Sequence, residues 1–144
     1  MKKIVIVTLC VVAMALTSCT ALSTVASSNT AASASGAACG KSLVTLYNNY
    51  KSTGNLDLTA NLTDVLTVAT AYSQLRENKE NSSYKTAFTS GMITSGAPFI
   101  TTANSSNIIS ALLNSTGLSN LDASNISQKA ETASTIISIL SAMK

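Results

Sequence analysis

The 144-residue chain contains no histidine and no tryptophan, and charged residues make up only 10% of it. Without histidine, it lacks the commonest general base and metal ligand in proteins. A Ser-His-Asp triad is therefore excluded, and the Gly-x-Ser-x-Gly motif of serine hydrolases is also absent from the sequence. Without tryptophan, an aromatic platform for sugars is not expected. We therefore expect a protein that is not an enzyme, with no catalytic residues, no metal and no cofactor.

Carboxylates are also few. Asp57 and Asp122 lie at predicted helix starts, where free backbone amides favour a capping role. Glu77 and Glu80 lie in a polar stretch that is typical of a solvated turn. A glycosidase would need two carboxylates at a defined separation in space, which the sequence does not give. Asp64 and Glu131 complete the set beyond the first 18 residues.

The first 18 residues have the layout of an export signal. Lys2-Lys3 forms a short basic start, and the apolar run over 4–16 is broken only by Thr8. As a helix, this run would span about 20 Å, which is less than the roughly 30 Å hydrocarbon core of a bilayer. The pattern predicts a signal peptide over 1–18 rather than a transmembrane helix. No block of lysine or arginine remains beyond it, so we expect no nucleic-acid binding.

The apolar run ends in Leu16-Thr17-Ser18-Cys19, an aliphatic residue and two small residues followed by cysteine. This motif resembles the lipobox of bacterial lipoproteins. The whole layout resembles the small predicted lipoproteins of unknown function in Bacteroides-like bacteria. The resemblance implies that the Cys19 thiol receives diacylglycerol, that cleavage precedes Cys19 and that the new amino group is acylated. Several acyl chains anchor firmly, at about 0.8 kcal/mol per buried methylene. An ordinary signal peptide before a chance cysteine is the alternative.

The residues after Cys19 bear on where the lipid anchor would lie. In enteric lipoproteins an aspartate after the cysteine favours the inner membrane, and here Thr20 occupies that position. In surface-exposed lipoproteins of Bacteroides-like bacteria, acidic residues often follow the cysteine, whereas here none occurs before Asp57. The resemblance therefore implies an outer-membrane anchor that faces the periplasm, with the cell surface as the alternative.

Cys39 is the cysteine left over. Cys10 belongs to the predicted signal peptide, and Cys19 to the predicted lipid anchor. An odd cysteine in an exported protein indicates either an intermolecular disulfide or a free thiol. A third interpretation is an unused cysteine at the edge of the domain.

Small and polar residues dominate 20–38, which predicts a flexible tether after Cys19. From Cys39 onward the apolar residues recur at helical spacing, for example Leu43, Leu46, Tyr47 and Tyr50. Helices are expected at about 43–50, 58–75, 82–95, 105–115 and 122–143, and either Asn61 or Thr59 is expected to cap the second. The sequence thus predicts three parts: a signal peptide over 1–18, a lipidated cysteine and tether over 19–38, and an all-α bundle of about five helices over 39–144.

Two local patterns have competing interpretations. Residues 36–42 (GAACGKS) resemble a P-loop but have one residue too few and no preceding strand, so nucleotide binding is not expected. Residues 52–57 (STGNLD) echo 115–122 (STGLSNLD), each between a short and a long predicted helix. The echo suggests two related αα-hairpins around the helix over 82–95. Recurring helix-end chemistry is the simpler explanation.

The sequence favours two functions over a third, an enzyme without histidine, which would need two carboxylates converging in a cleft. The first is a non-enzymatic interaction or structural module of the cell envelope, tethered to the membrane through Cys19 and bound to an envelope protein or to a second copy of itself. The alternative is a carrier of a lipid or other apolar ligand. A cavity between helices lined by Leu62, Tyr72, Phe88 and Ile109 would favour the carrier, and a dense core would count against it.

Overall fold

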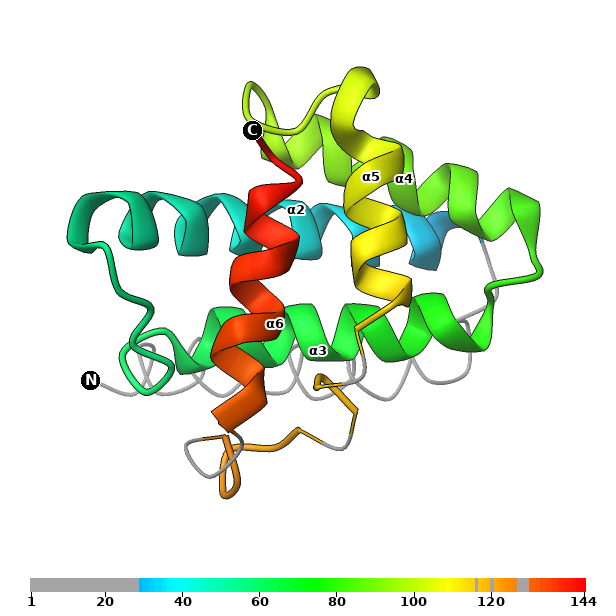
Figure 1. Cartoon of the computed structure of the whole chain (residues 1–144). Helices are drawn as coiled ribbons and strands as arrows, with labels where there is room; N and C mark the ends of the chain where they lie inside the picture. The colour runs from blue at the N-terminus through cyan, green and yellow to red at the C-terminus, as the bar shows by residue number, and fades with distance from the viewer. Residues whose placement is uncertain (1–28, 116, 120, 127–129) are drawn as a thin grey trace, which may run out of the picture.

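The computed structural model describes residues 29–115, 117–119, 121–126 and 130–144. The predicted signal peptide over 1–18, the lipidation of Cys19 and residues 20–28 lie outside these ranges. In the described part of the chain every regular element is an α-helix, so the all-α prediction is confirmed (Figure 1). The helices are α2 (Asn29–Thr53), α3 (Leu62–Glu77), α4 (Ser82–Gly96), α5 (Thr102–Leu113) and α6 (Ala130–Ser141).

Helix α2 begins at Asn29, ten residues before the predicted start of the domain. The predicted tether over 19–38 is therefore wrong for residues 29–38, which form the first part of α2. Ala32, Ser35 and Gly36 are all buried there. The composition that suggested a tether has a different cause, because small residues allow two helix backbones to approach closely.

That close approach is made with α4. A Cβ atom added at Gly36 would collide with the carbonyl group of Phe88, and one added at Gly40 would collide with that of Met92. On the opposite side of the contact, Gly91 leaves no room for a Cβ against the carbonyl of Ser33. Such backbone contacts favour weak Cα–H···O hydrogen bonds and place many atoms at van der Waals distance. Glycine at these positions is a packing requirement.

The other helices complete the core around this pair. Helix α3 lies along α2 in the opposite direction (Figure 1), and α5 and α6 cross them. Helix α5 contacts α3, α4 and α6, whereas α6 contacts α2 and α5. The largest fully buried side chains come from all five helices and two connections: Leu43, Leu46, Leu75, Tyr84, Phe88, Met92, Ile100, Ile108, Leu112, Leu118, Ile136 and Ile139.

An aspartate-capped turn precedes both α3 and α6. The helix expected after Asp122 begins instead at Ala130. The apolar pattern counted from Leu58 includes such a turn, whereas α3 begins at Leu62, directly after Asn61, one of its two predicted caps. Asp57 accepts hydrogen bonds from the backbone amides two and three residues later, at 2.9 and 3.0 Å. Asp122 does the same at 2.8 and 3.1 Å. Both carboxylates cap a turn ahead of the helix, because a side-chain acceptor stabilises a turn as well as a helix end.

The matching turns extend the sequence echo, but the two glycines within it have different roles. Gly54 has a φ of 70°, which suits its place after the end of α2. Gly117 instead packs against α6, since a Cβ there would lie 2.5 Å from the hydroxyl oxygen of Thr135. An ancestral duplication stays a prediction.

Replacing Gly36 with alanine tests the contact between α2 and α4, because helix propensity and the contact predict changes of opposite sign in the free energy of unfolding. In a helix interior, alanine is favoured over glycine by about 1 kcal/mol. Here the added methyl meets the Phe88 carbonyl, so we expect Gly36→Ala to lower the free energy of unfolding by roughly 1–3 kcal/mol. Urea unfolding followed by circular dichroism measures it. Ser90→Ala, at an exposed site on α4, should stay within about 0.5 kcal/mol. A Gly36→Ala protein more stable than the parent would contradict the contact.

Candidate functional site

The residues singled out from sequence do not converge on one site. Cys19 lies outside the described residues. Asp57 and Asp122 cap separate turns. The P-loop-like stretch 36–42 lies inside α2, with its two glycines against α4. Over the ranges that the structure describes, no three side chains among histidine, cysteine, aspartate and glutamate are grouped as a metal site would require.

Cys39 is a free thiol in the core, not at the edge of the domain. Burial raises the pKa of this thiol to about 12, because the thiolate would lose its hydration. The thiolate is the reactive form, so the folded protein holds Cys39 inert. An intermolecular disulfide through Cys39 would require α2 to separate from its neighbours.

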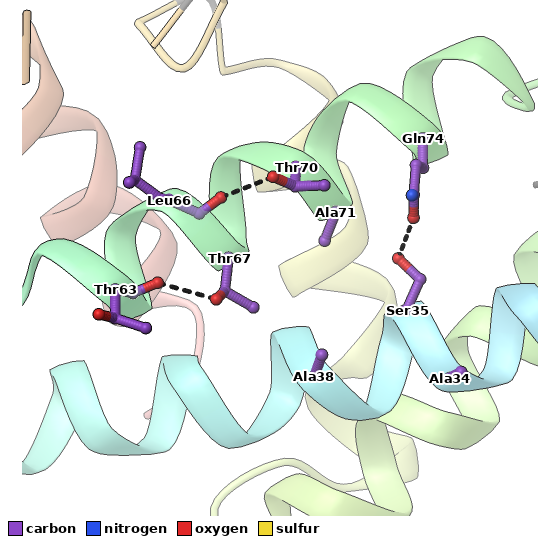
Figure 2. A pocket seen from close by; sticks show the side chains of 9 residues that line it. All are labelled: Ala34, Ser35, Ala38, Thr63, Leu66, Thr67, Thr70, Ala71 and Gln74. Carbon is purple, nitrogen blue, oxygen red and sulfur yellow. Dashed lines mark hydrogen bonds between the residues drawn. The ribbon is translucent and has the colours of Figure 1, made fainter. Parts of the chain in front are cut away.

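A groove of about 390 Å³ lies between α2 and α3 (Figure 2). None of the side chains that line it is charged. Three come from the first part of α2 and six from α3: Ala34, Ser35, Ala38, Thr63, Leu66, Thr67, Thr70, Ala71 and Gln74.

Two of the threonines that line the groove present little polar surface to it. The hydroxyl of Thr67 donates to the Thr63 carbonyl at 2.8 Å, and that of Thr70 donates to the Leu66 carbonyl at 2.9 Å (Figure 2). Because both hydroxyls are satisfied within α3, their methyl groups remain for contact with a ligand. The groove therefore offers mainly alkyl surface.

One end of the groove is polar. There the Ser35 hydroxyl donates to the side-chain oxygen of Gln74 at 2.5 Å and joins α2 to α3 (Figure 2). The hydroxyl of Tyr84, fully buried, has no hydrogen-bond partner within the described residues. Burial raises the pKa of Tyr84, and the negative charge of Glu77 raises it further. The nearby Ser35 hydroxyl lowers this pKa, although Ser35 lies outside hydrogen-bonding geometry. A buried polar group without a partner costs about 1–3 kcal/mol.

A second pocket, of about 360 Å³, lies at the C-terminal end of α3. Its lining is Tyr72, Ser73, Arg76, Glu77 and Ser119, and it is therefore polar and carries both signs of charge.

The cavity expected for a carrier is not the one observed. Phe88 is fully buried in the core, Leu62 and Ile109 are half-buried, and Tyr72 belongs to the polar pocket. The α2–α3 groove instead uses Ala34, Ser35 and Ala38, which the sequence had placed in the tether. The sequence did contain a sign that these residues are helical, because the small residues Ala32, Gly36 and Gly40 recur every fourth position, at helical spacing.

Comparison with known proteins adds no relative: no protein-family model, curated protein or solved structure matches the chain. Among the helices of the described residues, none combines the length and the apolar character needed to cross a membrane.

Burial of Cys39 predicts slow chemical modification. In a chain that begins at residue 19 and carries Cys19→Ser, Cys39 is the remaining thiol. We expect it to react with a thiol-specific reagent at least ~100-fold more slowly than in urea, because native modification requires local opening. Ala38→Cys in a Cys39→Ala background is the matched control, since position 38 is exposed on the same helix. Equal native rates for the two thiols would contradict the burial.

The raised pKa of Cys39 also predicts how stability depends on pH. The unfolded chain loses the thiol proton near the ordinary value of 9.0, and the folded chain near 12. The Cys39 contribution to the free energy of unfolding is therefore complete below pH 9 and falls as the pH rises towards 12, by up to about 1.4 kcal/mol per pH unit. Urea unfolding between pH 8 and 11 measures it as the difference from Cys39→Ala, which retains every other titrating group. A difference independent of pH would contradict the prediction.

Proposed function

We propose that the chain is a lipid-anchored module of the cell envelope whose helical domain binds a protein partner without catalysing a reaction. The lipid is carried by Cys19, and the anchor lies in the outer membrane on its periplasmic side. The lipobox and the residues after it support the anchor and its location. The groove between α2 and α3 supports binding.

With the proposed lipid on Cys19, the groove would lie close to the membrane. Nine residues, 20–28, separate Cys19 from Asn29, and even fully extended they reach roughly 30 Å. With the tether first predicted over 20–38, the reach would have been about twice as long. The proposed partner is accordingly an envelope protein that presents its binding segment near the membrane surface.

The groove carries the proposal because its chemistry suits one kind of contact. Its lining has no charge, and the hydroxyls of Thr67 and Thr70, two of its three threonines, are used within α3. Binding there would gain about 25 cal/mol for each Å² of apolar surface removed from water, without an ion to desolvate. An uncharged segment with small or aliphatic side chains is the complementary partner.

Site-specific photocrosslinking in intact cells tests this proposal. A photoreactive amino acid replaces Ala38 in the groove, or Ser90 on the exposed side of α4 as the matched control. A tag after Lys144 allows purification and mass spectrometry. We expect one reproducible envelope protein crosslinked from position 38 and not from position 90, since only the first lies in the groove.

The other outcomes each contradict the proposed partner. Crosslinks between copies of the chain would show that the groove is a self-association surface. The same proteins recovered from both positions would show non-specific contact. A lipid adduct at position 38, without protein, would favour the carrier function.

The carrier function is a second proposal, supported by the polar end of the groove. The apolar α2–α3 groove ends at the Ser35–Gln74 pair, and this arrangement suits an amphiphile with an alkyl part and a hydrogen-bonding head. The volume of about 390 Å³ lies within the range of small-molecule sites. Native mass spectrometry of the protein released from membranes would then show a bound lipid that is lost in Ala38→Phe, which fills the groove.

A further inference from the structure

Arg76 is the only arginine of the chain, and it lies in the polar pocket at the end of α3. Its Nη1 donates to the hydroxyl of Tyr72 at 3.2 Å and to that of Ser119 at 3.3 Å. The two hydroxyl oxygens are themselves 3.3 Å apart. This triangle joins α3 to the segment 117–119 and fixes one end of the guanidinium.

The fixed end determines what the guanidinium can still bind. Its two Nη1 hydrogens are used by Tyr72 and Ser119, whereas the Nε and Nη2 hydrogens have no partner in the described parts of the chain. Nε–H and Nη2–H form the planar fork that receives two oxygens of one carboxylate. Anchoring through Nη1 reduces the rotational freedom that the side chain would lose on binding.

Glu77 gives the same pocket a negative charge. Within the described residues neither Arg76 nor Glu77 is in an ion pair, although both line the pocket. Ser73, one turn before Glu77, adds a hydroxyl. A lone anion would meet repulsion from Glu77, and a lone cation would meet repulsion from Arg76. A ligand with both charges would have a partner for each.

We propose that this pocket binds a small zwitterion of the amino-acid type. The ligand carboxylate lies on the Nε/Nη2 fork of Arg76, and its ammonium group lies against the Glu77 carboxylate. The hydroxyl of Ser73 provides a further hydrogen bond. The volume of about 360 Å³ exceeds what glycine needs and leaves room for a side chain. The site is separate from the α2–α3 groove, so the inference does not depend on the proposed function.

Nuclear magnetic resonance on the full chain in detergent micelles tests the inference directly. Because the chain has one arginine, its single Nε–H signal is assigned without mutagenesis. Glycine, acetate and methylammonium are titrated separately to 100 mM at constant ionic strength. We expect a saturable shift of the Arg76 Nε–H signal with glycine, and a dissociation constant at least tenfold higher for acetate. No saturable shift with glycine, or equal affinities for glycine and acetate, would overturn the proposal.

Substitutions separate the two charges of the site. Glu77→Gln should remove the preference, so that acetate binds at least as tightly as glycine. Arg76→Lys should raise the dissociation constant for glycine at least tenfold, followed at the backbone amide of Ser119, while the remaining amide signals confirm the fold. Lys79→Gln is the matched control, because it changes the charge on a residue outside the pocket lining and should leave glycine binding unchanged. Loss of binding in Lys79→Gln alone would show a general charge effect and refute the site.

Discussion

The packing of α2 against α4 depends on three glycines, and the rest of the domain is arranged around that contact. Gly36 and Gly40 on α2, with Gly91 on α4, each bring one helix backbone against the carbonyl of the other. At such a separation there is no room for an added methyl group, because the atoms that it would meet belong to the neighbouring helix backbone. Because interiors pack as densely as organic crystals, displacing one of these helices would disturb the core shared with α3, α5 and α6.

The same contact determines which surfaces are available for binding. Its small residues hold the first part of α2 inside the domain, where Ala34, Ser35 and Ala38 form one wall of the groove. The opposite wall is α3, whose C-terminal end also supplies most of the polar pocket. Helix α3 thus contributes to both candidate sites. The two sites differ in chemistry. In the groove, threonine hydroxyls bond to their own helix, so that alkyl groups form the surface. In the polar pocket, the charges of Arg76 and Glu77 are not in ion pairs within the described residues.

Buried polar groups distinguish this core from a purely aliphatic one. Cys39 is enclosed as a neutral thiol, and the low polarity around it accounts for its raised pKa. Tyr84 is enclosed with its hydroxyl unpaired, next to the Ser35–Gln74 bond at the groove end. Ser35 can still accept a hydrogen bond, since its own proton is donated to Gln74. The Ser35 hydroxyl at the polar end of the groove therefore keeps an acceptor site, and the Tyr84 hydroxyl, which does not line the groove, is an unused donor in the core.

The sequence by itself determined the all-α class and the limits of α4, because helical apolar spacing and the residues at a helix end act over a few neighbouring residues. In the structure, the Asn81 side chain caps the start of α4 and the extended backbone of Ala97 ends it. It misplaced the start of α2, because a segment rich in glycine, alanine and serine is expected both in a flexible linker and in a close helix–helix contact. It also placed the start of α6 too early, because an aspartate caps a turn as readily as a helix, whereas Asn61, one of the two caps expected for α3, does precede that helix. Only the tertiary structure decided that Cys39 is buried and that Arg76, Glu77 and Ser119 share a pocket. Those relations join residues far apart in the chain, and local spacing carries no information about them.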